Sequence, residues 1–242
     1  MFKKTYSFNK DIEKMQSNSL TRSKNLSASL PDNLSRIFIN IQNQPLIYTI
    51  ANPRLRKVNP QEAQNIVKQL YDSIYKDGWL NHIENTSRLW RDIENKEVKT
   101  ETDRWNLRCC VTEHILRLMK KEFNKQERNP EKYIYFACDI QTIPFGVMKL
   151  KCKPNDLEIS YIVTHPGVEK CSYFLMEKAV NQSCKMGFKG KLRLITATDD
   201  LYDVYHKMGF INNGDYMTLE PEKSNFWFLS PINEEYHFKR FP

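Results

Sequence analysis

A strand–helix–strand–helix pattern between Leu157 and Phe210 constrains the fold of this 242-residue chain more than any other feature. The β-branched run LEISYIVT ends at His165-Pro166, and a helical pattern then continues to Gly187. A second strand-like run, LRLITA, leads into a helical segment that ends at Gly209-Phe210, and glycine commonly terminates a helix. The stretch therefore predicts a β-α-β-α unit, and the rest of the chain is interpreted as its scaffold.

Several further β-rich runs predict a sheet around this unit. The runs KYIYFACD, FGVMKLKC and LEISYIVT are separated by the turn-forming segments QTIP and KPND, which predicts an antiparallel meander. Two short strands are expected between residues 36 and 50, and YMTLEP and NFWFLSP are expected to complete the sheet after Phe210. The predicted fold class is α/β, with a mixed, mainly antiparallel sheet of six or seven strands flanked by helices.

Two helices are predicted upstream of the meander. Asn59 is a candidate N-cap, Pro60 suits a first helical turn, and apolar residues then recur at helical spacing as far as Ile74. A longer helix is expected from about Thr102 to Asn129-Pro130. We therefore expect one domain over residues 34–242, with a helical insert at about 80–127.

Residues 1–33 are rich in Ser, Asn and Lys and have no sustained apolar period, which predicts an unstructured leader. It lacks the apolar core of a secretory signal, so it is interpreted as a floppy tail or as a targeting segment of the kind found on bacterial effectors. The expected location is the cytoplasm, or a host cytosol reached by a non-classical route. No apolar run approaches the roughly 20 residues of a membrane span.

Charge and cysteine content narrow the choice of partners and cofactors. The net charge of +8 favours contact with polyanions, but no basic cluster is dense enough to indicate a nucleic-acid surface. The six cysteines form no CxxC pair and no zinc-like spacing, so no metal site is predicted. Cys109 and Cys110 are expected to be buried, reduced thiols. A Cys-His enzyme that pairs them with His82 or His114 lacks a nucleophile motif.

Four pieces of the Leu157–Phe210 stretch resemble the GCN5-related N-acetyltransferase superfamily. They are Val163–Pro166 at a strand end, the loop Gly167–Tyr173, the strand Leu192–Ala197, and the helix end Tyr205–Phe210. The resemblance implies an acetyltransferase-like fold and transfer of an acetyl group from acetyl-CoA to a primary amine.

The resemblance also implies the catalytic residues. Tyr205 matches the tyrosine that serves as general acid to the leaving thiolate, and a phenol with a pKa of about 10 suits that task. Glu158 matches a position at which some members place a general base. Tyr161 is expected to line the acceptor side. Simple strand alternation places Glu158 and Tyr161 on opposite faces of their strand.

The same resemblance implies a cofactor site. The backbone groups of Ile162 and Val163 are expected to hold the pantetheine arm and the thioester. A helix start holds a pyrophosphate through its amides, and Lys170 adds charge there. Thr198 replaces an asparagine that contacts the cofactor or the loop. The residues expected at the helix start are Val168, Lys170, Cys171, Ser172 and Tyr173.

The loop departs from the family pattern Arg/Gln-x-x-Gly-x-Gly/Ala, because its only glycine is Gly167. This departure favours an alternative, a non-catalytic binding module that keeps the fold and docks a partner protein. For the enzyme, the helical insert and the leader favour a protein lysine or N-terminus as acceptor over a polyamine or drug.

Overall fold

The computed structural model describes residues 53–76, 101–124, 130–140, 143–166, 168, 171–196 and 199–239. Several expectations fall outside this part: the leader, the strands between residues 36 and 50, much of the insert at about 80–127, and the residues His82, Lys170 and Thr198. No helix in the described part is long and apolar enough to cross a membrane.

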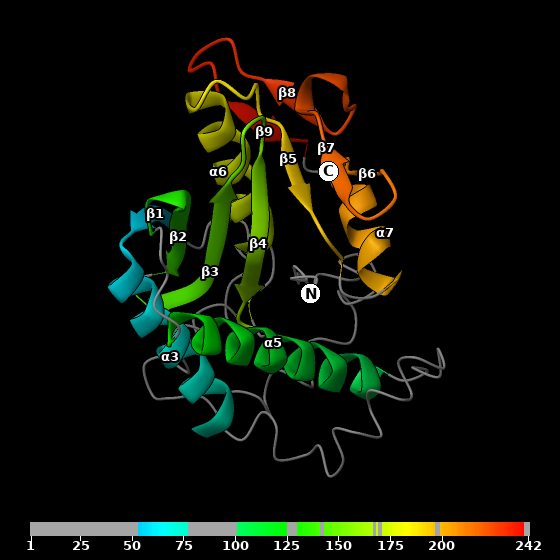
Figure 1. Cartoon of the computed structure of the whole chain (residues 1–242). Coiled ribbons are helices and arrows are strands. Elements are labelled where there is room, and N and C mark those ends of the chain that lie inside the picture. Colours follow the sequence, from blue (N-terminus) through cyan, green and yellow to red (C-terminus); the bar gives the residue numbers. More distant parts are fainter. Residues whose placement is uncertain are drawn as a thin grey trace.

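In the described part of the chain, seven strands form one sheet in the order β1-β2-β3-β4-β5-β7-β6 (Figure 1). The strands are β1 (Arg54–Val58), β2 (Tyr133–Ile140), β3 (Ile143–Cys152), β4 (Leu157–Thr164), β5 (Leu192–Leu194), β6 (Ile211–Asn212) and β7 (Met217–Leu219). Every neighbouring pair is antiparallel except β4 and β5, which are parallel. This confirms the mixed, mainly antiparallel sheet and the β2-β3-β4 meander.

The described helices are α3 (Pro60–Lys76), α5 (Glu101–Phe123), α6 (Cys171–Lys185) and α7 (Asp199–Lys207). Asn59 is the N-cap of α3, because its Oδ1 accepts a hydrogen bond from the Glu62 N–H at 2.8 Å. The helix α5 ends at Phe123, before the expected stop at Asn129-Pro130.

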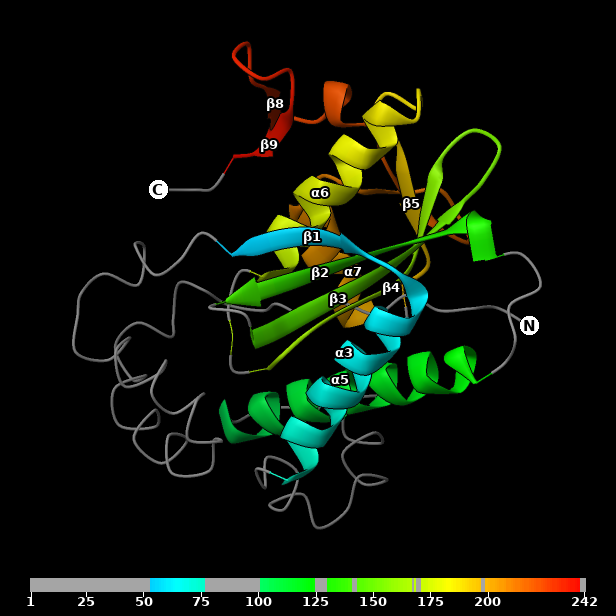
Figure 2. The ribbon, with the colours of Figure 1, turned by 90° about the vertical axis from the view of Figure 1, so that its left-hand side faces the viewer.

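The helices cover the two faces of the sheet (Figure 2). A Cβ added to Gly146 on β3 would lie 3.1 Å from Leu175, so that face packs on α6. Lys149, three residues along β3, points to the opposite face, where its Nζ lies 3.0 Å from Glu122 of α5. This ammonium is buried and also lies 4.0 Å from the centre of the Tyr133 ring. The ion pair therefore joins α5 to the centre of the sheet.

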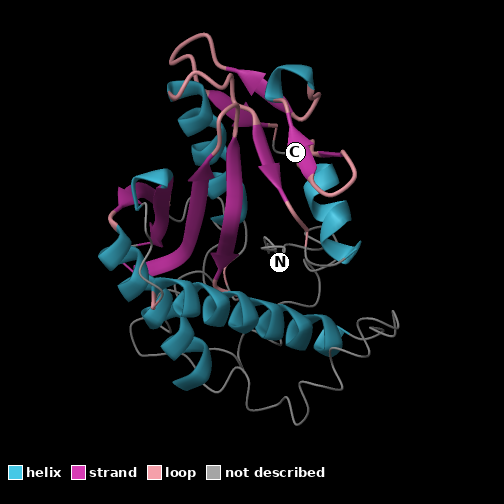
Figure 3. Cartoon of the chain, viewed as in Figure 1, coloured by secondary structure: helices cyan, strands magenta, loops and turns pink. Residues whose placement is uncertain are grey.

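The C-terminal segment forms a separate hairpin of β8 (Trp227–Leu229) and β9 (Tyr236–Phe238) (Figure 3). The expectation that NFWFLSP completes the main sheet was therefore wrong, because within the described part of the chain β8 pairs only with β9.

A stripe of three α6 residues at a spacing of four holds β9 in place. The Tyr173 ring stacks on Phe238 at 5.1 Å, and Glu177 Oε1 accepts the Phe238 N–H at 3.0 Å. The amide of Asn181 donates to the Tyr236 carbonyl at 2.9 Å and accepts the Tyr236 N–H at 2.7 Å. These α6 side chains therefore form hydrogen bonds with backbone groups of β9 that face away from β8.

We predict that Asn181→Ala lowers the free energy of unfolding by about 1–3 kcal/mol, because two backbone groups of Tyr236 lose their partner. Urea denaturation of the full chain measures this loss. The control is Lys185→Ala on the same helix, which removes an exposed ion pair with Glu235 and should cost less than about 1 kcal/mol. Equal losses in the two variants would contradict the prediction.

Candidate active site

The parallel ladder between β4 and β5 is short. It joins three residue pairs, Leu157 with Leu192, Glu158 with Arg193, and Ile159 with Leu194. β4 then continues to Thr164 beside β3, while the two parallel strands diverge (Figure 1). The structure therefore contains the splayed strand edge that was expected near Ile162 and Val163.

The register against β3 decides which backbone groups of β4 face this opening. The His165 N–H donates to the Phe145 carbonyl at 2.7 Å, so His165 turns its backbone groups toward β3. In an antiparallel pair such positions alternate, so Val163 also faces β3 whereas Ile162 and Thr164 face the β5 side. The backbone groups of Ile162 are therefore available on the β5 side, and a cofactor contact there stays a prediction. For Val163 the expectation of free backbone groups was wrong, because they face β3. Thr164, which the sequence reasoning missed, has backbone groups that face the β5 side instead.

Two helices begin at the open end of this divergence. β4 and β5 run in the same direction, and each leads through a short loop into a helix, α6 and α7 respectively. The N–H groups in the first turn of a helix point toward its N-terminus and carry a partial positive charge. An anionic ligand at the carboxyl ends of these two strands would therefore meet α6 amides, as in other phosphate sites at helix starts.

The first turn of α6 contains Cys171, Ser172 and Tyr173, because the helix starts earlier than the sequence pattern indicated. Their side chains are occupied by packing. Cys171 Sγ lies 3.4 Å from Cys138 Sγ on β2, Ser172 is buried, and Tyr173 stacks on the C-terminal hairpin. The side chains of Cys171 and Tyr173 are therefore directed into the fold, and the backbone amides of this turn are the groups that point toward the helix start. The Val168 N–H is already donated to the His165 carbonyl at 3.0 Å.

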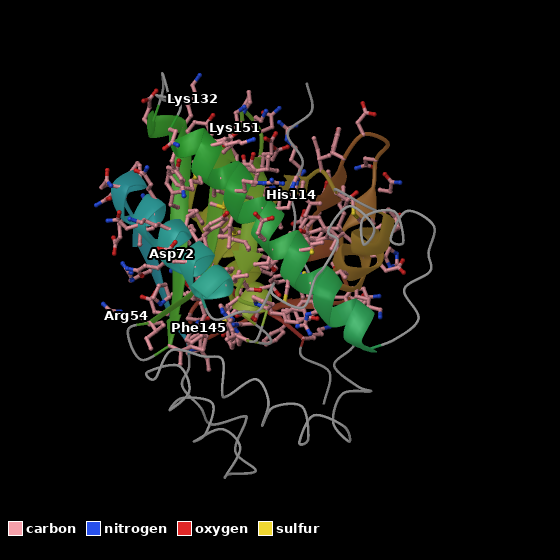
Figure 4. The ribbon with its side chains drawn as sticks, turned by 90° about the horizontal axis from the view of Figure 1, so that it is seen from below. Arg54, Asp72, His114, Lys132, Phe145 and Lys151 are labelled. Carbon is pink, nitrogen blue, oxygen red and sulfur yellow. The ribbon has the colours of Figure 1, made fainter. Side chains whose placement is uncertain are left out.

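A β-bulge in β4 changes which side chains share a face. Lys149 is paired with Tyr161 and Leu150 with Ile159, so Ser160 is an extra residue on β4. Glu158 is paired with Lys151, which points to the same face as Lys149. Lys151 is labelled in Figure 4. The expectation that Glu158 and Tyr161 lie on opposite faces was therefore wrong, and both face α5.

Glu158 lies in the part of β4 that is still paired with β5. Its Oε2 is 3.0 Å from Lys153 Nζ and 3.6 Å from Arg193 Nε, and the side chain is 15% exposed. Tyr161, beyond the end of the ladder, is buried. The Glu158 carboxylate thus belongs to an ion-pair network in the part of β4 that is paired with β5. It lies on the same face of the sheet as Tyr161.

Tyr205 belongs to the end of α7, and its position has a local explanation. The Phe210 N–H donates to the Tyr205 carbonyl at 3.0 Å and the Gly209 N–H donates to the His206 carbonyl at 2.9 Å. With Gly209 at φ +90°, these bonds form a Schellman motif, in which the flanking apolar residues pack together. The rings of Tyr205 and Phe210 lie 5.6 Å apart, and Tyr205 is fully buried. The helix end requires the glycine and an apolar pair, but not the hydroxyl of Tyr205.

The Cys-His alternative finds no support in α5. Burial raises the pKa of both Cys109 and Cys110 to about 12, so at neutral pH each is a thiol rather than a nucleophilic thiolate. Both are buried, as expected from the sequence. His114, midway along α5 (Figure 4), lies beside Arg117, and burial and nearby cations lower its pKa. The described residues contain no group of His, Cys, Asp and Glu side chains that could hold a metal ion.

Comparisons with solved structures find acetyltransferases. The PaiA N-acetyltransferase of Thermoplasma acidophilum, in complex with coenzyme A, is 14% identical with a TM-score of 0.39, covering 69% of this chain and 97% of its own. A GCN5-related N-acetyltransferase from Rhodopseudomonas palustris is 14% identical with a TM-score of 0.41, covering 70% and 96%. The N-acetyltransferase PseH of Campylobacter jejuni, in complex with acetyl coenzyme A, is 13% identical with a TM-score of 0.30, covering 68% and 96%. No protein-family model and no curated protein matches the chain.

His165, at the end of β4, gives the folded state a pH dependence. Burial lowers its pKa to about 3, while an unfolded histidine titrates near 6.5. Between these values the unfolded chain binds a proton that the folded chain does not, so stability falls as the pH drops below about 6.5.

We predict that His165→Asn, which cannot titrate, removes this contribution. Between pH 7 and pH 5.5 the wild-type protein should lose about 1 kcal/mol of unfolding free energy more than the variant. Urea denaturation at several pH values measures the difference. The gap between the two proteins should stay constant from pH 7 to pH 8, and a gap that changes equally in both ranges would contradict the assignment to His165.

Proposed function

We propose that this chain is an acetyl-CoA-dependent N-acetyltransferase. The observation that carries the proposal is the divergence of β4 from β5 after three residue pairs, with α6 beginning at its open end. The motif resemblance at Val163–Pro166 and Tyr205–Phe210 supports the same activity.

The cofactor site that we propose uses backbone groups throughout. The first-turn amides of α6, from Cys171 onward, would hold the pyrophosphate, and Lys170 and Thr198 remain part of the proposed site from their sequence positions. Along β4, the backbone groups of Ile162 and Thr164 face away from β3 and would bind the amides of the pantetheine arm, as an added strand would. The acyl thioester would then lie toward the closed end of the divergence, near Ser160.

Two side chains carry the proposed proton transfers. The attacking amine must lose a proton, and we assign this step to Glu158, acting directly or through water. The leaving thiolate must gain one, and we assign this to the hydroxyl of Tyr205, which the helix end does not require. Tyr161 shares the face of Glu158 and would line the acceptor side.

We further propose a primary amine of a protein, a lysine or an N-terminus, as the acceptor. The support is α5, which packs on the face of the sheet that carries Glu158 and Tyr161 and so shapes the approach to it. The Ser- and Lys-rich leader of residues 1–33 favours a role as a bacterial effector.

A binding module that docks a partner protein is the second candidate. It is favoured by one observation, the absence of glycine from the first turn of α6, where Cys171 and Ser172 stand. Such a module would keep the fold without using acetyl-CoA.

Titration of the full chain with acetyl-CoA distinguishes the two candidates. We expect saturable heat in a calorimeter and a rise in melting temperature that grows with ligand concentration. Desulfo-CoA, which keeps the pyrophosphate and the arm, should also bind, because the contacts proposed for the pyrophosphate and the arm do not involve the sulfur. No heat and no rise in melting temperature at millimolar acetyl-CoA would contradict the proposed enzyme and leave the binding module as the candidate.

We predict that Tyr205→Phe lowers kcat by about 100-fold while the protein stays folded. The phenylalanine keeps the ring packing on Phe210 and the helix end, so the melting temperature should change by only about 2 °C. Release of CoA with a lysine-containing peptide panel as acceptors measures kcat. Tyr202→Phe, on the same helix with its ring stacked on His206, is the control and should keep wild-type activity. Equal activity in both variants would remove Tyr205 as the acid.

A further inference from the structure

Ser160 is the extra residue of the bulge in β4. Its two neighbours in the chain, Ile159 and Tyr161, face consecutive residues of β3, so Ser160 is inserted between two regular pairs. Bulges of this kind redirect a side chain and occur frequently beside active sites. The insertion lies where the β4–β5 ladder stops, because Ile159 is the last residue of β4 that is paired with β5.

The hydroxyl of Ser160 is buried with no hydrogen-bond partner. The residue is 3% exposed, and within the described part of the chain nothing accepts from or donates to its Oγ. A buried hydroxyl in this state is unfavourable, and such groups in folded proteins call for a reason. Ser183 provides the contrast within the same protein, because its buried hydroxyl donates to the Lys191 carbonyl at 2.7 Å.

The position of Ser160 indicates which part of a ligand it would meet. Going from the start of α6 down β4, the backbone positions that face the opening are Thr164 and then Ile162. The inserted Ser160 follows, directly before Ile159, where the pairing with β5 begins. An arm that starts at the helix and follows this edge ends at Ser160. Glu158 and Tyr161, which we assign to the acceptor side, flank the same point.

We propose that the Ser160 hydroxyl binds the acyl end of the thioester by donating a hydrogen bond to its carbonyl oxygen. This inference rests on the proposed acetyltransferase function and adds a residue to it. In the transfer, the amine nitrogen forms a bond to the carbonyl carbon and the carbon–sulfur bond breaks. The amine proton goes to Glu158, and the sulfur takes a proton from Tyr205. The carbonyl oxygen gains negative charge during the attack, and a fixed donor stabilises that charge.

The test compares the affinities of the full chain for acetyl-CoA and for CoA, which lacks the carbonyl. Wild type should bind acetyl-CoA more tightly than CoA. In Ser160→Ala the affinity for acetyl-CoA should fall about threefold to tenfold, the value of one neutral hydrogen bond, with the affinity for CoA unchanged. Ser160→Thr keeps the hydroxyl and should restore the preference.

The melting temperature of the protein without ligand tests the proposal independently of the binding measurements. Here the variant should not lose stability, although it loses affinity for acetyl-CoA. Removing an unsatisfied hydroxyl should leave the melting temperature of Ser160→Ala equal to or above that of wild type. The control Ser183→Ala should melt lower and keep the wild-type preference for acetyl-CoA.

The outcomes separate the two proposals. A wild-type protein that binds both ligands, beside a Ser160→Ala variant with the same preference, would overturn the role of Ser160 and leave the acetyltransferase standing. A melting temperature of Ser160→Ala well below that of wild type would show that the hydroxyl is satisfied within the fold, and would overturn it too. A wild-type protein that binds neither ligand would overturn both proposals.

Discussion

The three-pair ladder between β4 and β5 is the constraint on which the candidate site depends. β4 is held along its whole length by β3, so it stays extended after β5 has left it. Backbone N–H and C=O groups need partners when they are kept from water, and the ladder provides none from β5 for Ile162 and Thr164. Both strands point toward the starts of α6 and α7. A polar edge and a helix N-terminus therefore meet at one end of the sheet, and this juxtaposition suits a ligand that has amides at one point and phosphates at another.

The residues of the motif at Tyr205–Phe210 can be present for two different reasons, the geometry of the helix end or the function. Gly209 is required by the Schellman geometry, and a Cβ there would lie 2.2 Å from Ser224 Oγ, so the glycine is fixed by the fold alone. Phe210 is fixed by its packing against the Tyr205 ring. The Gly-Phe pair is thus weak evidence for function, since many helices end this way. Within this motif, the functional argument rests on the phenolic oxygen of Tyr205, which takes no part in the two backbone hydrogen bonds of the helix end.

The sequence predicted those elements whose pattern is local and long. The helix after Asn59 and the three strands of the meander follow from capping and from β-branched runs, and the structure confirms them. The bulge at Ser160 had no sequence signal, because neither glycine nor proline marks it, and one inserted residue moved Glu158 to the face of Tyr161. No sequence signal indicated that β8 pairs with β9 either. Its strands are three residues long, and contacts with α6 far away in the sequence decide their place.

The packing of the first turn of α6 explains how cysteine and serine can stand where the family pattern has glycine. A side chain obstructs a phosphate only if it points toward the ligand. The Cys171 side chain instead points at Cys138 under the sheet, and Ser172 is buried. The amides of this turn can therefore face the helix N-terminus while the side chains fill the core. In such an arrangement small residues are needed because of the packing beneath the helix, so cysteine and serine replace glycine without closing the approach to the backbone.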